Sequence, residues 1–165
     1  MMLEEFNNGD RTSIVPVLRP CIDVQRWIDQ IADARPFGSV QALTGFAREA
    51  ANPFTEAEIE AALAHHPRIG DRAAGQSTEA SLSRSEQAGV DPSDADITEA
   101  LAAGNRAYEE KFGRVFLIRA KGRSAGDILD ALNERLAHSP EEEAPIVAQQ
   151  LREIAILRLE GAVTP

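Results

Sequence analysis

The sequence predicts an all-α protein, a single-domain bundle of about seven or eight helices that spans residues 1–165. Apolar side chains recur at helical spacing in most segments, and residues that start or stop helices stand at the ends of these segments. Strand-like alternation of apolar and polar residues is nearly absent. A chain of 165 residues without repeats or low-complexity tracts suits one hydrophobic core, so we expect one domain.

The first half of the chain contains three predicted helices. Residues 21–34 carry isoleucines at helical spacing, and this helix must stop before Pro36. Ser39 is suited to cap the next helix, because its hydroxyl can accept a hydrogen bond from a free backbone N–H. Thr55 and Glu58 form a capping box, which begins the third helix.

The second half contains four predicted helices. The first covers residues 77–88, and a longer one closes at Gly113, since glycine favours helix ends. Ser124 begins another capping box. Ser139 is followed by proline and two glutamates, which is a strong start signal for a last helix that runs to about Glu160.

Composition excludes several classes of function. The net charge is −10, from 27 acidic and 17 basic residues, and no run of Lys or Arg offsets it, so nucleic acid is not an expected partner. An anionic small molecule would need a local pocket of positive groups. No apolar run approaches the roughly 20 residues that span a bilayer, and the acidic N-terminus is not a secretory signal. We therefore expect no membrane association and a cytoplasmic location, in keeping with the single cysteine, Cys21.

The stretch "LAHHPRIGDR" sets His65 and His66 side by side before Pro67. A zinc site needs three or four ligands at suitable spacing, and no HxxxH, CxxC or HxxE pattern surrounds the pair, so we expect no metal. Two interpretations stay open for each histidine. It is either a polar residue at a helix end, where the dipole suits it, or a proton-transfer residue.

The segment "SLSRSEQAG", residues 81–89, has little apolar surface to bury. Glu86 shares a helical face with Leu82, and Ser83 and Gln87 share a neighbouring face. Such a helix either lies on the surface, which is the more frequent case, or lines a polar pocket.

Two further features allow a structural or a functional interpretation. Arg158 continues the apolar stripe of the last helix in steps of three and four residues. It can reach solvent, pair with Glu86, or bind a substrate carboxylate through two hydrogen bonds. The apolar, β-branched segment 114–122 is expected to be extended. It is either a core element or a stretch of main chain that holds a ring with amide edges.

Taken together, these stretches resemble one family, the OHCU decarboxylases of urate degradation, where OHCU is 2-oxo-4-hydroxy-4-carboxy-5-ureidoimidazoline. The similarity covers about Leu3 to Glu160, and the order and spacing of the motifs make it specific. The matching elements are Phe6-Asn7, Arg26-Trp27, Arg35 to Phe37, "HPRIG" at 66–70, "SLSRSEQAG" at 81–89 and "N..YE.KFG..FLI.A.GRS" from Asn105 to Ser124.

The resemblance implies an all-helical, cofactor-free enzyme, usually a homodimer, that removes CO₂ from OHCU and delivers (S)-allantoin. It implies that His66 is the catalytic residue and Glu86 its acidic companion. Arg158 matches an arginine that the family places near the site. The chain lacks the peroxisomal tripeptide of some animal relatives, which favours the cytosol. The other residues implied to line the substrate site are Pro67, Ser83, Arg84, Ser85, Gln87 and the backbone of Phe116, Leu117, Ile118, Arg119 and Ala120.

The implied chemistry suits these residue types. Loss of CO₂ leaves an electron pair on carbon, which the conjugated C=O and C=N groups of OHCU can hold without pyridoxal phosphate or a metal. Imidazole moves protons near neutral pH, and a hydrogen bond with Glu86 would fix the tautomer of His66 and favour its charged form. His66 then either takes the proton of the substrate hydroxyl or gives one to the carbon after CO₂ leaves.

Two other classes of function stay open, and a third is disfavoured. A helical binding module would hold a purine-derived ligand without turnover. A structural interaction domain would leave His66 and Glu86 far apart and solvated. A hydrolase of the same pathway, such as a 5-hydroxyisourate hydrolase, requires a β-rich sandwich, for which the sequence has too few strands.

Overall fold

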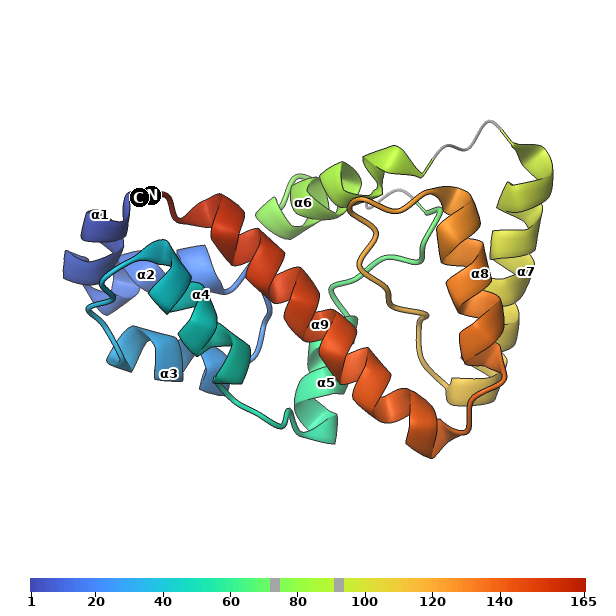
Figure 1. Cartoon of the computed structure of the whole chain (residues 1–165), viewed down its shortest axis with the longest axis horizontal. Coiled ribbons are helices and arrows are strands. Elements are labelled where there is room, and N and C mark those ends of the chain that lie inside the picture. The colour runs from blue at the N-terminus through green and yellow to red at the C-terminus, as the bar shows by residue number, and fades with distance from the viewer. Residues whose placement is uncertain (72–74, 91–93) are drawn as a thin grey trace. The chain divides into compact units, whose positions relative to one another are not determined.

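The computed structural model describes residues 1–71, 75–90 and 94–165. These residues form nine α-helices, one 3-10 helix and no strand, which confirms the all-α prediction (Figure 1). The helices are α1 (Leu3–Asn8), α2 (Arg11–Leu18), α3 (Gln25–Asp33), α4 (Val40–Glu49), α5 (Glu56–Leu63), α6 (Thr78–Glu86), the 3-10 helix η1 (Gln87–Gly89), α7 (Ala95–Phe112), α8 (Ala125–Leu136) and α9 (Pro140–Ala162).

The chain divides into two compact units. Unit 1 consists of Met1–Ala62 and Arg152–Pro165, and unit 2 consists of Leu63–Leu151. Unit 1 therefore holds α1 to α4, most of α5 and the last part of α9, while unit 2 holds α6 to α8 and the first part of α9. Every residue that the sequence implies for the substrate site belongs to unit 2, with the exception of Arg158.

Unit 1 is built around the fully buried indole of Trp27. Its Nε1 donates a hydrogen bond of 2.9 Å to the carbonyl of Ala47 and so joins α3 to α4. The Asn7 side chain exchanges two hydrogen bonds with the main chain of Phe37, at 2.9 and 2.8 Å. Arg35 donates to two carbonyl oxygens at the C-terminal end of α1. Asn7, Trp27 and Arg35 of the "FN", "RW" and "RPF" motifs thus help to build this unit.

The two chain termini lie side by side in unit 1 (Figure 1). The Met1 amino group donates to the carbonyl of Ala162 at 3.0 Å. The N–H of Leu3 donates to Thr164 at 2.8 Å, and the N–H of Thr164 donates to Met1 at 2.9 Å. These bonds tie the first helix to the end of the last one.

Unit 2 is centred on the packing of α7 against α8 (Figure 1). Gly104 of α7 lies so close to α8 that a Cβ at this position would stand 2.5 Å from Cδ2 and 3.1 Å from Cγ of Leu132. A side chain at this position would therefore require Leu132 to shift. The buried cluster around it consists of Ile69, Leu101, Tyr108, Phe116, Ile118, Ala120, Ala125, Ile128 and Leu132.

Four helix starts confirm the predicted capping residues. The Ser39 hydroxyl accepts a hydrogen bond from the N–H of Ala42 at the start of α4. The N–H of Thr55 donates to the Glu58 carboxylate at 2.8 Å, and the N–H of Glu58 donates to the Thr55 hydroxyl at 3.1 Å. The same reciprocal pattern begins α8 and α9. Each start depends on residues three apart, so it is visible in the sequence.

The helices differ from the sequence prediction at several boundaries. The short helices α1 and α2 were not predicted, because six and eight residues show little periodicity. A cap is nevertheless present, since the Asp10 side chain accepts from the N–H of Ser13. Helix α9 passes through Gly161 and ends at Ala162. Helix α7 begins after its capping residue Asp94, and part of its predicted start lies outside the described residues.

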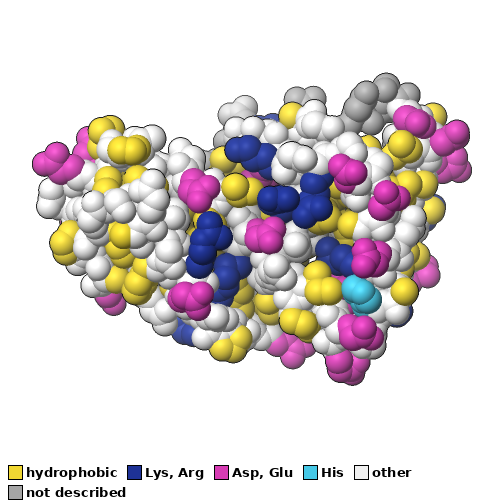
Figure 2. Space-filling view, viewed as in Figure 1, with side chains coloured by type: hydrophobic (Ala, Val, Ile, Leu, Met, Phe, Trp, Pro, Cys, Tyr) yellow, Lys and Arg dark blue, Asp and Glu magenta, His cyan; other side chains and the backbone are white. Residues whose placement is uncertain are grey.

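On the face in Figure 2, acidic side chains are spread widely and form no single patch. Within the described residues, the exposed large hydrophobic side chains are Met1, Met2 and Phe46. No helix formed by the described residues is long and apolar enough to cross a membrane.

Candidate functional site

His66 lies in the loop that follows α5, and Pro67 keeps this stretch out of the helix. The N–H of His66 donates to the carbonyl of Leu63 at 3.0 Å, which closes a turn at the helix end. His66 and Pro67 are both half-buried. The predicted helix end is confirmed, although α5 stops at Leu63, slightly before the two histidines.

The loop is held to α7 by a bidentate ion pair. Arg68 donates to the two carboxylate oxygens of Glu109 through Nε at 2.6 Å and through an η-nitrogen at 2.9 Å. The Arg68 guanidinium lowers the pKa of Glu109 below its usual value, so the carboxylate is charged at neutral pH. Two parallel bonds fix the direction of the arginine side chain as well as its distance.

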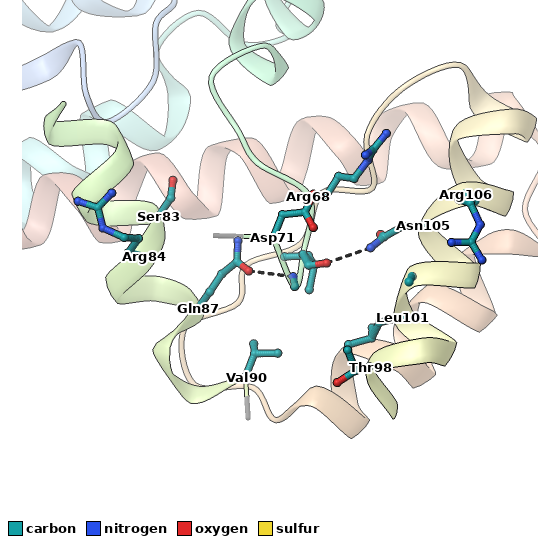
Figure 3. A pocket seen from close by; sticks show the side chains of 13 residues that line it. Arg68, Asp71, Ser83, Arg84, Gln87, Val90, Thr98, Leu101, Asn105 and Arg106 are labelled. Carbon is teal, nitrogen blue, oxygen red and sulfur yellow. Dashed lines mark hydrogen bonds between the residues drawn. The ribbon is translucent and has the colours of Figure 1, made fainter. Parts of the chain in front are cut away.

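Two hydrogen bonds fix the backbone of the same loop (Figure 3). The Asn105 amide of α7 donates to the carbonyl of Ile69 at 2.9 Å, and both residues are buried. The N–H of Gly70 donates to the side-chain oxygen of Gln87 at 3.0 Å. Gly70 has a φ of +93°, a conformation that side-chain-bearing residues rarely adopt. The loop is therefore anchored to two different elements, α7 and η1.

Helix α6 turns a polar side chain inward. The Ser77 hydroxyl caps it by accepting from the N–H of Ala80. Ser83 is buried, Glu86 is half-buried, and Ser85 is exposed. This arrangement favours the pocket interpretation of the helix over a purely surface one, since a surface helix has no need to bury a serine.

A cavity of about 580 Å³ lies within unit 2, between the loop at 68–71, the C-terminal part of α6 and η1, and α7 (Figure 3). Small-molecule sites commonly measure about 300–1,000 Å³. Ile69 and Leu101 supply apolar wall, and Arg84 and Arg106 bring positive charge to it. Asp71 adds a carboxylate, while Arg68 is paired with Glu109. The cavity thus combines apolar surface with the positive groups that an anionic ligand requires in an acidic protein.

The cavity unites only part of the predicted site. Ser83, Arg84 and Gln87 line it. The other predicted residues of unit 2 are not among the described residues that line it, namely His66, Pro67, Ser85, Glu86 and residues 116–120. Their part in substrate binding or catalysis stays a prediction.

Residues 115–120 form the extended connector that the sequence predicts, with neither helix nor strand. Phe116, Leu117, Ile118 and Ala120 are buried. Two of its backbone groups are engaged within unit 2. The Leu117 carbonyl accepts from Arg135 at 2.7 Å, and the Arg119 N–H donates to Gln150 at 2.8 Å.

Two candidates remain, Arg158 and His65. Arg158 belongs to unit 1, where it is 5% exposed and donates to the carbonyl of Pro20 at 2.9 Å. It therefore does not extend to solvent. His65 is half-exposed, and its Nδ1 stands 3.7 Å from the Glu79 carboxylate. That position suits the helix-end interpretation of His65.

The sequence did not reveal a buried polar network beneath the connector. One oxygen of Glu143 accepts from the Tyr108 hydroxyl at 2.6 Å and from Nε of Arg135 at 2.7 Å, while the other lies 3.1 Å from Nδ1 of His138. The Arg135 guanidinium also lies 4.6 Å from the ring centre of Phe116. In the sequence, Glu143 stands out only as the residue after the capping box of the last helix. This position does not identify its partners on α7 and α8.

The ionisation of this network follows from its surroundings. Burial alone raises the pKa of Glu143, but hydrogen bonds from Arg135 and Tyr108 outweigh it, so the pKa lies below its usual value. Burial and then the bond to Glu143 raise the pKa of Tyr108 far above its usual value. The network therefore holds a charged Glu143 and a neutral Tyr108 at neutral pH.

Among the residues described, no three His, Cys, Asp or Glu side chains are grouped to hold a metal ion.

Comparison with known sequences gives consistent results. The sequence profile of the OHCU decarboxylase family matches residues 7–160. A 2-oxo-4-hydroxy-4-carboxy-5-ureidoimidazoline decarboxylase from Halalkalicoccus jeotgali is 25% identical, over 100% of this chain and 93% of that protein. The protein of the same name from Haloferax volcanii is 27% identical, over 96% of this chain and 94% of its own length.

Solved structures show the same fold. A crystal structure of an OHCU decarboxylase in the presence of (S)-allantoin superposes with a TM-score of 0.67 and 26% identity, covering 93% of this chain and 97% of the other. A crystal structure of (S)-allantoin synthase gives a TM-score of 0.71 over 99% of this chain and 54% of the other. At 16% identity, the second likeness concerns the fold alone.

Proposed function

Because the chain belongs to the OHCU decarboxylase family, we propose that it removes CO₂ from OHCU and releases (S)-allantoin without a cofactor. The observation that carries the proposal is the family match over residues 7–160, which includes helix α6 and the histidine loop, the loop after α5 that carries His66. The likeness at 26% identity to an OHCU decarboxylase crystallised in the presence of (S)-allantoin supports the same reaction.

The reaction asks little of the protein beyond orientation and one proton. The bond between the ring carbon and the carboxylate breaks, CO₂ leaves, and the electron pair passes into the neighbouring C=N group of the ring. The ring nitrogen of that group takes up one proton and its carbon takes up another, while the hydroxyl loses its proton to become the carbonyl of the product, so that one proton is taken up overall. Protonation from one side yields a single enantiomer.

We assign the proton transfer to His66 and its support to Glu86. The residues that follow His66 are tied to α7 and η1 through Arg68, Ile69 and Gly70, so the backbone that carries His66 is fixed. A fixed imidazole suits proton transfer, which requires placement within hydrogen-bond reach of the reacting atom. Glu86, half-buried near the end of α6, is proposed to hold the ring in one tautomer.

The remaining substrate contacts are proposed in two groups. Ser83, Arg84 and Gln87 line the cavity and offer hydroxyl, guanidinium and amide groups to a carboxylate or a ureido group. Pro67, Ser85, the backbone of residues 116–120, and Arg158 are proposed from the family resemblance. For the connector, the proposal concerns other backbone groups than the Arg119 N–H, which is bonded to Gln150.

The test is turnover of freshly prepared OHCU, followed by circular dichroism of the allantoin formed. His66→Asn is expected to lower kcat by about 10²–10⁴-fold, because general acid–base groups contribute about that much. Glu86→Gln is expected to lower kcat as well. His65→Asn and Glu79→Gln are the matched controls and retain activity. An active His66→Asn enzyme would refute the assignment, and tight binding of OHCU without turnover would identify a binding module instead.

We also propose a cytoplasmic homodimer, as the family resemblance implies. The measurement is the mass in solution by light scattering at several protein concentrations. A mass of one chain, about 17.9 kDa, at all concentrations would rule out the dimer.

A further inference from the structure

The connector at 115–120 is buried but belongs to no helix or sheet. A buried peptide group without a hydrogen-bond partner destabilises a protein, so this segment must obtain partners from elsewhere. Side chains supply them. Arg135 of α8 donates to the Leu117 carbonyl at 2.7 Å, and Gln150 of α9 accepts from the Arg119 N–H at 2.8 Å.

These two bonds hold the peptide groups on both sides of Ile118. The carbonyl of Leu117 belongs to the peptide that precedes Ile118, and the N–H of Arg119 belongs to the peptide that follows it. Rotation of either peptide would break one of the bonds. The backbone conformation of Ile118 is therefore set by side chains of α8 and α9.

Arg135 is itself immobilised. It is 6% exposed, it is paired with Glu143 at 2.7 Å, and it lies 4.6 Å from the centre of the Phe116 ring. Glu143 is held in turn by Tyr108 at 2.6 Å. The network thus connects α7, α8 and α9 to one point on the connector.

We infer that Arg135 and Gln150 are positioning residues of the decarboxylase, which orient the main chain at Ile118 for substrate. The inference rests on the proposed function, in which the backbone of residues 116–120 meets the substrate. Neither side chain needs to touch OHCU. Each acts through the peptide group that it holds.

Gln150 is the residue to test, because Arg135 lies in a buried ion pair whose loss endangers folding. Gln150→Ala removes the acceptor for the Arg119 N–H and frees that peptide to rotate. We expect KM for OHCU to rise about 2- to 12-fold, the equivalent of one hydrogen bond, with a smaller change in kcat. Gln150→Glu keeps an oxygen acceptor at the same place and is expected to restore a KM within about twofold of the wild type.

Gln149→Ala is the matched control, since Gln149 is the exposed neighbour on the same helix. All variants are assayed well below their thermal midpoints, with folding verified by circular dichroism. A merely structural role for Gln150 lowers the midpoint and leaves KM unchanged, and that result would overturn the inference. An equal rise of KM in Gln149→Ala would overturn it too. If the wild type does not turn over OHCU, the proposed function fails and this inference fails with it. If the wild type is active and KM is unchanged in Gln150→Ala, only this inference fails.

Discussion

Replacing Asn105 should destabilise the protein and impair the histidine loop at the same time. The Asn105 amide donates to the carbonyl of Ile69 at 2.9 Å, and both residues are at least nine-tenths buried. Asn105→Ala leaves that carbonyl without its donor, which costs about 1–3 kcal/mol of unfolding free energy. For a chain of this size, about 2 kcal/mol corresponds to a thermal midpoint lower by about 4–8 °C. The loop that carries His66 is loosened, so kcat/KM is expected to fall as well.

Two companion variants separate the hydrogen bond from the loss of volume. Asn105→Asp keeps the size but replaces the donor by a carboxylate oxygen facing the Ile69 carbonyl, and it should be at least as destabilising. Glu110→Ala changes an exposed residue of the same helix and is expected to stay within about 0.5 kcal/mol of the wild type. Urea unfolding of each variant gives the free energies. An Asn105→Asp protein as stable as the wild type would show that the hydrogen bond does not stabilise the loop.

Two further predictions concern unit packing and pH. Gly104→Ala should lower the unfolding free energy by up to about 2 kcal/mol, because overpacking against Leu132 costs about 1–3 kcal/mol and helix propensity returns about 1. Gly45→Ala, with no atom within 4 Å of the new Cβ, should instead stabilise the protein by up to about 1 kcal/mol. Thermal midpoints that shift in the same direction in both variants would refute this reasoning. Glu143→Gln should cost about 3–5 kcal/mol at pH 7, since it leaves the buried Arg135 charge without its counter-ion. The folded-state pKa of Glu143 is depressed, so its stabilisation is present above its unfolded value of 4.5 and is lost as pH falls through the folded pKa. The stability gap between variant and wild type, measured by urea unfolding, should therefore shrink in acid, and a gap that stays constant down to about pH 3 would contradict this reasoning.

Features that depend on neighbouring residues were predictable from the sequence. The capping pairs at Thr55 and Glu58 and at Ser124 and Asp127 involve residues three apart, and both are present. The left-handed Gly113 at the end of α7 is a similar case. The extended connector was also predicted, because its β-branched and apolar residues are unlike those of the helices around it.

Features that depend on distant residues were not predictable in this way. The Asn105 bond to Ile69 joins positions 36 apart, and the Tyr108 bond to Glu143 joins positions 35 apart. No periodic pattern encodes such pairs, because the fold alone brings them together. The proposed pairing of His66 with Glu86 is of the same kind. It came from the family resemblance and stays a prediction.

The residues of "HPRIG" meet different structural requirements. Arg68 is required by its ion pair with Glu109, Ile69 by the core of unit 2, and Gly70 by its positive φ. Pro67 keeps the stretch out of the helix. Within the turn, the backbone N–H of His66 donates to the carbonyl of Leu63. A motif whose other members all serve to fix one backbone segment is what a proton-transfer residue needs, since such a residue depends on placement rather than on its own packing. We therefore expect the variants that loosen the loop to impair turnover without removing the histidine.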